Sequence, residues 1–292
     1  MSPSRTNKTR RGGYLLLTVI ALIAVASLLL GRVATTSMRV AATAMHEERE
    51  LRHRWAITSM RQHALNVAPQ VFVHRQETSD PLQDDSEPAP TVWKDVELGG
   101  QTWRVILADE SAKLDVARIA LHFGQQKAQS AINEIVTEGS GIRAASDLAS
   151  IGQVSAGRWD DWLTDRNGTP LTDPVSIAAA TRDLTLWGDG RLNIHRCNAE
   201  SIETLWRILF NRPAPKSLLR DRRSTSNQSA SQLVNSLGLR ESQARLARQW
   251  LSDGAGCYSV WVFCETDRRV PVSFKVEWGN GGSAALRRIY QY

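Results

Sequence analysis

The stretch TRRGGYLLLTVIALIAVASLLLGR, residues 9–32, joins a basic beginning to a long apolar run. The basic side chains that precede the run are Arg5, Lys8, Arg10 and Arg11. No acidic side chain accompanies them in residues 1–13, and this asymmetry favours a cytoplasmic location for the basic leader. Residues 14–30 carry no charge, and their length is near the short limit for a helix that crosses a bilayer core roughly 30 Å thick. They are therefore predicted to span a membrane once.

The chain continues from the apolar run in helix-forming residues, and its first proline after the run is Pro69. Apolar residues of the second part recur at helical spacing: Ile57, Met60, Ala64, Val67 and Val71. One helix is therefore predicted over residues 14–75. A cleaved secretory signal usually has a shorter apolar core that ends at a small-residue cleavage site. Two alternatives stay open: a removed secretory signal, and a plain single-pass anchor with an unrelated periplasmic binding domain.

Four segments that differ in composition and periodicity follow this helix. Residues 76–91 are acidic and proline-rich and are predicted to be a linker. Residues 92–110 hold two β-type runs around a Gly-Gly pair, which is the pattern of a hairpin. Residues 111–251 have helical periodicity, and residues 252–292 return to strand-forming residues. The predicted fold class is α+β: a long N-terminal membrane helix, then an antiparallel sheet interrupted by a mainly helical inserted domain.

Two segments of the chain look alike, LADESAKLDVARI at 107–119 and LWGDGRLNIHRCNAESI at 186–202. Each has an acidic turn, then a basic residue, then a hydrophobic–Asp/Asn–hydrophobic run that leads into a helix. The Asp-Gly pair of the second segment favours a tight turn, and Asn193 or Asn198 is suited to cap the helix that follows. Turn and cap chemistry without any ligand accounts for both segments.

The beginning of the chain resembles type IV pilins and the pseudopilins of type II secretion, through its short basic leader, its glycine and its apolar helix that becomes amphipathic. The resemblance implies that prepilin peptidase cuts between Gly13 and Tyr14, with Gly12 as a second potential cut site. Most members carry a glutamate at mature position five, where this chain has Thr18. A neutral residue there is typical of one subgroup, the K-type minor pseudopilins of general secretion.

Three further patches also resemble the K-type minor pseudopilins. The matching residues are Asp109, Glu110, Lys113 and Asp115 in the first look-alike segment, Gly188, Asp189, Gly190, Arg191 and Asn193 in the second, and Asp161 and Trp162 in DDWLTDRNG. The chain departs from the family at His195-Arg196-Cys197, where Asn-Thr-Ala is favoured, and at Thr164, which replaces an aspartate. The resemblance covers most of the chain in patches and implies that the sheet is pilin-like.

What the resemblance implies for function is a role in assembly. A K-like minor pseudopilin of type II secretion joins other minor pseudopilins at the tip of a short pseudopilus and serves the export of folded proteins. The implied location is a single pass through the inner membrane, with a cytoplasmic N-terminus and a periplasmic bulk. Prepilin peptidase and the inner-membrane secretion platform are further implied partners. The sequence does not distinguish this function from that of a minor pilin of a type IV pilus.

Charge leaves a second class of function open. The chain of 292 residues has a formal net charge of +6 and a pI near 9.5, which permits a nucleic-acid partner. GDGRLNI resembles the helix start of helix-hairpin-helix modules, so a membrane-anchored DNA-binding protein of the competence type is the alternative. No leucine-proline-glycine hairpin follows Leu205, so nucleic acid is not the expected partner. The basic residues 220–229 are predicted to form an exposed loop that needs no partner.

Little in the sequence indicates catalysis or a cofactor. A nucleophile elbow, a P-loop and a paired Cys/His arrangement are all missing, so an enzyme is not expected. The loop TDRNGTPLTD offers oxygen ligands but does not fit the calcium-hand spacing. An irregular calcium site that includes Asp161 or Asp165 is one interpretation, and a solvated turn is the favoured one. Cys257 and Cys264 either approach each other across neighbouring strands or, like Cys197, stay unpaired thiols.

Overall fold

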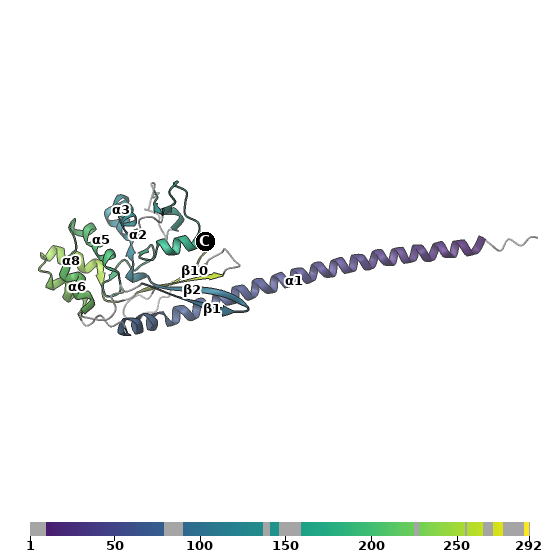
Figure 1. Ribbon diagram of the computed structural model, residues 1–292, viewed down its shortest axis with the longest axis horizontal. Coiled ribbons are helices and arrows are strands. Elements are labelled where there is room, and N and C mark those ends of the chain that lie inside the picture. Colours follow the sequence, from purple (N-terminus) through teal and green to yellow (C-terminus); the bar gives the residue numbers. More distant parts are fainter. Residues whose placement is uncertain are drawn as a thin grey trace, which may run out of the picture. The chain divides into compact units, whose positions relative to one another are not determined.

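The computed structural model of the chain describes most of its residues (Figure 1). The described ranges are 10–78, 90–136, 141–145, 159–224, 228–254, 256–264, 271–276 and 289–291. The chain divides into two compact units, Met1–Ala56 and Ile57–Tyr292. Most of the predicted linker at 76–91 lies outside the described residues.

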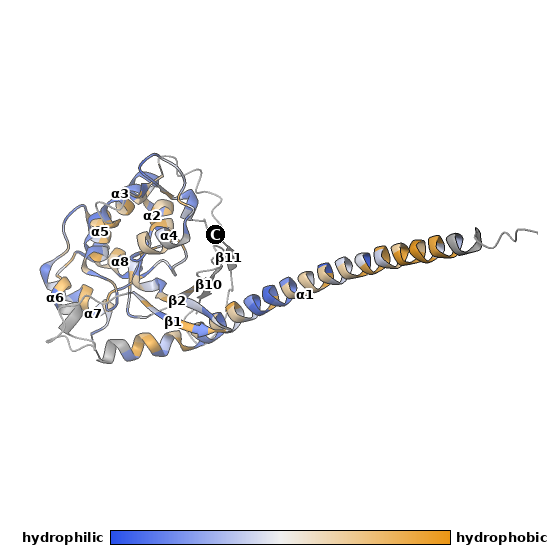
Figure 2. Cartoon of the chain, turned by 45° about the vertical axis from the view of Figure 1, so that its right-hand side comes forward, coloured by the Kyte–Doolittle hydropathy of each residue, from blue (hydrophilic) through white to orange (hydrophobic). Residues whose placement is uncertain are grey.

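Helix α1, Arg10–Thr78, begins before and ends after the predicted range of 14–75. A window of 18 residues near its N-terminus has a mean hydropathy of 2.6, and none of that window is buried. By length and composition this part of α1 can cross a membrane, and Figure 2 shows the apolar residues along it. Thr18 lies in this part, and its hydroxyl donates to the carbonyl oxygens of Tyr14 (3.1 Å) and Leu15 (2.8 Å). The hydroxyl is therefore satisfied within its own helix and adds no charge.

The last turns of α1 belong to the second unit and bury one stripe of side chains. The buried residues of this stripe are Met60, Leu65, Ala68 and Phe72. Met60 belongs to the apolar residues that recur at helical spacing in the sequence, but beyond it the buried side chains lie one residue later than that series, a rotation of about 100° around the helix. Phe72 stacks on Tyr258 of the sheet with 5.9 Å between ring centroids. Turning Leu65 and Phe72 inward buries more apolar surface than turning the predicted Ala64 and Val71 inward, which explains the rotation.

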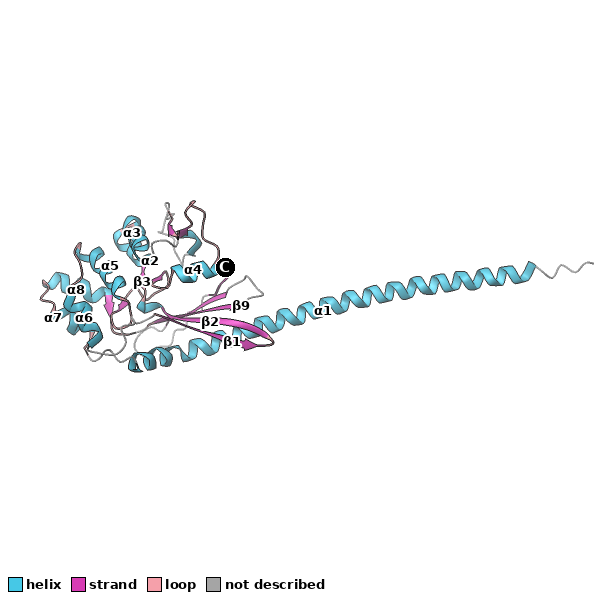
Figure 3. Cartoon of the chain, viewed as in Figure 1, coloured by secondary structure: helices cyan, strands magenta, loops and turns pink. Residues whose placement is uncertain are grey.

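The sheet of the second unit has, among the described residues, five antiparallel strands in the order β1-β2-β9-β10-β11 (Figure 3). The strands are β1 Thr91–Leu98, β2 Gln101–Asp109, β9 Cys257–Cys264, β10 Pro271–Val276 and β11 Ile289–Gln291. β1 and β2 form the predicted hairpin, whose turn residues Gly99 and Gly100 have φ of 64° and 75°. β9 pairs with β2 from Trp103↔Cys264 to Asp109↔Tyr258. The strands before and after the helical segment are therefore neighbours, which confirms the α+β prediction.

The segment between β2 and β9, called the insertion here, is mainly helical. Its helices are α2 Val116–Phe123, α3 Gln125–Ile135, α4 Pro174–Ala180, α5 Ala199–Phe210, α6 Lys216–Ser224, α7 Ala230–Ser236 and α8 Glu241–Trp250, with short 3-10 helices η1 Glu110–Ala112 and η3 Trp159–Asp161. Helix α6 continues to Ser224, so the predicted loop at 220–229 was wrong in its first half. Asp115, Asp173, Asn198 and Ser229 cap the starts of α2, α4, α5 and α7, as their side-chain chemistry predicts.

Two-residue strands tie distant parts of the insertion together. β3 (Leu114–Asp115) pairs with β6 (Leu184–Thr185), and β7 (Leu192–Asn193) pairs with β8 (Leu251–Ser252), both in parallel. β4 (Arg143–Ala144) pairs with β5 (Leu163–Thr164) in antiparallel orientation. The two parallel pairs bring the two look-alike segments of the sequence to the part of the insertion next to the sheet.

Aromatic side chains connect the sheet to the elements on its two faces. Successive residues of a strand point to opposite faces, so Tyr258 and Trp261 of β9 lie on different sides of the sheet. Tyr258 contacts Phe72 of α1, whereas Trp261 lies 6.3 Å from Trp187 of the insertion. Trp187 in turn meets Trp159 edge-on at 5.9 Å. The last turns of α1 and the insertion therefore cover opposite faces of the sheet.

Candidate functional site

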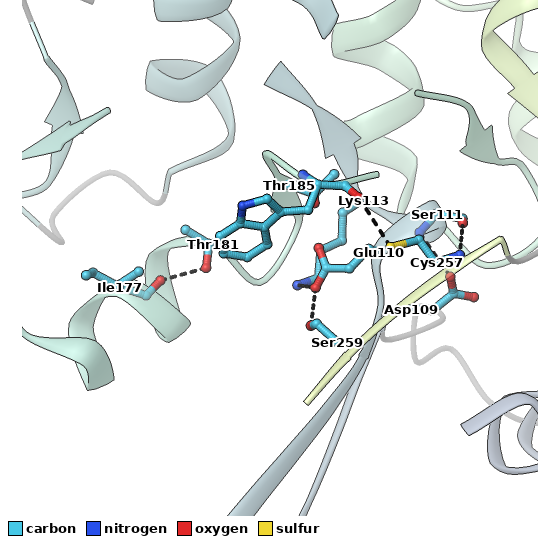
Figure 4. Close-up of polar contacts among 10 residues, drawn as sticks. Asp109, Glu110, Ser111, Lys113, Ile177, Thr181, Thr185, Cys257 and Ser259 are labelled. Atoms are coloured by element: carbon cyan, nitrogen blue, oxygen red, sulfur yellow. Dashed lines mark hydrogen bonds and ion pairs between the residues drawn. The ribbon is translucent and has the colours of Figure 1, made fainter. Parts of the chain in front are cut away.

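Polar side chains gather where the chain leaves the sheet for the insertion and where it returns (Figure 4). This cluster, called the polar junction, consists of Asp109, Glu110, Ser111, Lys113, Arg196, Cys257 and Ser259. β2 and η1 supply its first members, and β9 supplies the last ones. Apart from Arg196, whose side chain keeps 13% of its surface exposed, these residues are buried. The sequence therefore places charged groups in the part of the fold where burial is most costly.

Glu110 and Lys113 form an ion pair inside the polar junction. The Lys113 Nζ lies 3.0 Å from Glu110 Oε1, and the two side chains are 4% and 0% exposed, respectively. The hydroxyl of Ser259 on β9 donates to the same carboxylate oxygen. Among the described residues, Glu110 Oε2 has no hydrogen-bond partner. The pair thus holds the first turn of the insertion against the returning strand, at the cost of removing two charges from water.

Asp109 connects the end of β2 to the turn that precedes α5. Its Oδ1 accepts the backbone N–H of Ser111 at 3.0 Å, and its Oδ2 accepts Arg196 Nη1 at 3.0 Å. Burial raises the pKa of Asp109 to about 6, although the nearby Arg196 guanidinium acts to lower it. Ser111 completes the connection, because its Oγ accepts the backbone N–H groups of Gly256 (2.8 Å) and Cys257 (3.1 Å).

Asp115 and the Gly-Asp-Gly turn lie against each other. Asp115 Oδ1 accepts the backbone N–H of Arg118 at 2.9 Å and so caps α2. Burial raises the pKa of Asp115 to about 7. A Cβ added at Gly188 would lie 3.3 Å from Asp115 Oδ2, so a side chain there would crowd this carboxylate. The two look-alike segments therefore form one structural unit.

Arg118 fastens this unit to the end of α8. Its guanidinium donates to the carbonyl of Gly190 and to that of Gln249, the latter at 3.3 Å, and lies 4.4 Å above the ring of Trp250. Gly190 has a φ of 79°, and a Cβ there would lie 2.5 Å from Arg118 Cδ. The positive φ favours glycine at this position, and any side chain there would displace the end of the Arg118 side chain.

The remaining residues of the second motif form turns. Asp189 Oδ1 accepts the backbone N–H of Arg191 at 2.9 Å, and Asn193 Oδ1 accepts that of His195 at 3.1 Å. The cap of α5 is Asn198 rather than Asn193, through a 2.7 Å bond to the N–H of Ser201. In this motif, turn and cap bonds account for each of these side chains, and the Arg191 side chain is exposed.

The third motif lies at η3. Trp162 is buried in the core of the insertion, and its carbonyl accepts the backbone N–H of Ala145 at 2.8 Å. Asp161 is exposed. In the loop that follows, Asp165 Oδ1 accepts the N–H groups of Asn167 (2.8 Å) and Thr169 (2.9 Å), and these bonds lower the pKa of its carboxyl. Among the described residues no three His, Cys, Asp or Glu side chains gather as metal ligands, and calcium binding stays a prediction.

The three cysteines are buried, and no disulfide joins them in the described part of the chain. Cys257 and Cys264 stand at the two ends of β9, roughly 23 Å apart at 3.3 Å per residue. Of the two alternatives, their approach across neighbouring strands was therefore wrong, and buried thiols without a disulfide between them are what the structure has. The thiol of Cys257 donates to the carbonyl of Trp187 at 3.2 Å. Burial raises the pKa of this thiol well above its ordinary value, which keeps it protonated and unreactive.

Sequence reasoning missed Arg118, Arg196 and Ser259, which complete the cluster and its surroundings. Arg196 was noted only as a departure from a family pattern, and nothing local marks it as the partner of Asp109, which lies 87 positions earlier. The sequence offered one indirect indication: two adjacent acidic residues at the end of a buried strand need cations nearby. Which cations these are depends on the tertiary structure.

Comparisons with known proteins give a limited result. No protein-family model and no curated protein matches the sequence. A similar solved structure is a chain of the GspK-GspI-GspJ complex from the type 2 secretion system of enterotoxigenic Escherichia coli. It is 13% identical, with a TM-score of 0.44, over 86% of this chain and 99% of that chain. Similarity of this degree carries no argument about function.

Proposed function

We propose that this chain is a minor pseudopilin of the type II (general) secretion system, of the K type, that acts at the tip of the pseudopilus. The observation that supports this most is the combination in residues 9–32 and α1. A leader with four basic and no acidic residues reaches Gly12-Gly13, and the uncharged residues 14–30 follow at once. These residues lie inside one helix, Arg10–Thr78, of 69 residues. A signal sequence that is cut off need not be continuous with a helix of the domain that follows it, whereas here the two form one helix.

The same helix serves two environments in this proposal. Its apolar first part holds the subunit in the inner membrane before assembly, because about 17 uncharged residues are enough to reach across the apolar core. In the filament the same apolar surface packs against helices of neighbouring subunits. The neutral Thr18, with its hydroxyl bonded to its own helix, leaves no charge to pair with a subunit above, which suits the tip.

The insertion is the part of the chain that is available to other proteins. The polar junction and the tryptophan contacts hold it against one face of the sheet, so it is presented as a rigid surface. The carboxylates of the junction are occupied by Lys113, Arg196 and backbone N–H groups rather than directed to solvent. This arrangement suits a role in assembly through contacts between subunits, with prepilin peptidase and the inner-membrane platform as transient partners.

The experiment that tests this proposal is the identity of the N-terminal residue. The full chain is produced in membranes with and without a prepilin peptidase, and its intact mass and first residue are determined. A mature chain that begins at Tyr14, only when the peptidase is present, is the expected result. Gly13→Val should abolish the cut, whereas Gly12→Val, the matched control one residue earlier, should leave it unchanged.

Other outcomes would contradict the proposal in distinct ways. A cut that Gly12→Val abolishes and Gly13→Val does not would move the processing site by one residue. A chain that keeps its leader in the presence of the peptidase would indicate a plain anchor, and a chain that begins beyond residue 30 would indicate a secretory signal. Either of these last two results would remove the main support for a pseudopilin.

A further inference from the structure

Positive charge is concentrated in one stretch of the insertion. Residues 204–240 contain one acidic residue, Asp221, and seven basic ones. The basic residues are Arg207, Arg212, Lys216, Arg220, Arg222, Arg223 and Arg240. This stretch therefore carries a formal charge of +6, which equals the charge of the whole chain, so all other residues together are neutral. Residues 1–46 carry the same formal charge of +6, from six basic residues and no acidic one, so the remaining residues, 47–203 and 241–292, sum to −6. Within the second compact unit, residues 204–240 are therefore more basic than the rest.

The basic residues belong to helices that lie together. α5, α6, α7 and α8 share one core, with Leu205, Leu218, Leu233 and Ala247 buried in it. Figure 3 shows these helices together at one end of the insertion. The exposed cations that these helices and the residues flanking them carry, Arg212, Lys216, Arg240 and Arg245, are called the basic helical end.

The cations of the basic helical end differ from other arginines on the same helices. Arg207 pairs with Glu134 and Glu203, and Arg248 pairs with Glu241. Among the described side chains, no acidic group pairs with Lys216, Arg240 or Arg245. Arg212 lies 5.8 Å above the ring of Phe210, which orients its guanidinium. The fold therefore neutralises some of its arginines and leaves this set exposed to solvent.

We infer that the basic helical end is a docking surface for an acidic segment of a partner protein. Guanidinium groups bind carboxylates in a two-pronged geometry, which suits Asp- and Glu-rich chains. A lipid surface fits less well, because the described part of α5–α8 exposes no large hydrophobic side chain to insert. A phosphate backbone also fits less well. The exposed Glu200 and Glu241 stand in the first turns of α5 and α8, where phosphate-binding helices offer uncovered N–H groups.

This inference does not depend on the proposed function, and its test uses a different readout. The full chain in neutral detergent is titrated into a fluorescent oligoglutamate peptide, and the dissociation constant is measured by anisotropy. All proteins carry glutamine in place of the four leader bases, so that the leader does not bind the probe. The patch variant is Lys216→Glu/Arg240→Glu/Arg245→Glu. The control variant, Lys94→Glu/Lys127→Glu/Arg143→Glu, changes three exposed cations elsewhere and has the same net charge.

The patch variant should bind the peptide about tenfold more weakly or worse, because three attractive pairs are lost and three negative charges then repel the peptide. The control variant should lose less than about twofold, and binding should weaken as added salt shortens the screening length. Equal losses in both variants would mean that only net charge matters and would overturn the inference. Tighter binding to a DNA duplex than to the peptide, lost in the patch variant, would overturn it in favour of nucleic acid.

Folding is not expected to limit the test. Lys216 and Arg240 stand at the starts of α6 and α8, where negative charge is favourable to the helix dipole. Should the glutamate variant fold poorly by circular dichroism, Lys216→Gln/Arg240→Gln/Arg245→Gln takes its place, with glutamine at the control positions. The same comparison between patch and control then decides the inference.

Discussion

Methionine in place of Lys113 would remove the cation that pairs with Glu110 while it keeps nearly the same side-chain volume. The Lys113 stem is buried, so an unbranched apolar side chain fits the same space. What changes is the charge: the Glu110 carboxylate, which has 0% of its surface exposed, would keep the Ser259 hydroxyl as a donor and lose the ammonium at 3.0 Å. Glu110 Oε2 already has no partner, so it cannot compensate.

The expected loss follows from this geometry. Removal of one member of a buried ion pair costs about 3–5 kcal/mol, because the remaining charge is left without compensation in a medium of low polarity. For a folded unit the size of Ile57–Tyr292, each kcal/mol corresponds to roughly 2–4 °C in melting temperature. Lys113→Met should therefore lower the melting temperature by roughly 6–20 °C.

The assay is thermal unfolding of the full chain in neutral detergent, followed by tryptophan fluorescence, because Trp187 and Trp261 lie next to the polar junction. Glu110→Gln/Lys113→Met is the informative companion, since it removes both charges and should recover most of the loss. A single variant that melts within about 2 °C of the parent, or a double variant as unstable as the single one, would refute the reasoning about a buried pair.

Two further predictions concern Asp115 and Thr18. The pKa of Asp115 is raised by burial from 3.8 to about 7, so the folded state binds its proton more tightly than the unfolded state, and the stability that this provides is present below pH 4 and lost as the pH rises through 7. Asp115→Asn keeps the cap of α2 and removes this loss, which reaches about 4 kcal/mol once the pH is above the folded-state pKa. The melting temperatures of variant and parent should therefore diverge between about pH 4 and pH 7, and parallel profiles would contradict the assignment. Thr18→Glu should reduce the recovery of a complex with other minor pseudopilins, because an unpaired carboxylate in an apolar helix costs roughly 2.5–3.5 kcal/mol. The control variant Thr18→Val should not reduce this recovery. Unchanged recovery of the glutamate variant would weaken the proposal that the subunit acts at the tip.

Local features of the fold follow from local sequence. The uncharged run after the leader decides that α1 begins with a lipid-compatible part, and Gly99-Gly100 decides the hairpin because both residues need positive φ. Asn198 decides where α5 begins, since its side chain accepts the free N–H of Ser201. Each of these choices depends on residues within about one turn of each other, which is the range over which spacing and capping rules operate.

The roles of the motif residues could be predicted from local sequence only in part. Turn and cap bonds were foreseeable for Asp109, Asp115 and Asp189, because such side chains commonly bond to N–H groups two or three residues later. The sequence did not indicate that Asp109 would be buried and Asp115 half-buried, or that burial would raise the pKa of both carboxyls. Burial depends on which other segments cover a turn, and that is not a local property.

The sequence by itself determined the class of this protein: a basic leader, one long helix that begins in lipid-compatible residues, and a sheet interrupted by helices. The tertiary structure decided which groups meet. The buried side of α1 is the one on which Phe72 contacts Tyr258, and Cys257 and Cys264 lie on one strand. Arg196 is the cation that pairs with Asp109, and Arg118 is the one that donates to the Gly190 carbonyl. Helical spacing leaves the exact face undecided, and a buried charge accepts any cation that the packing brings near, so these pairings exist only once the insertion has closed on the sheet.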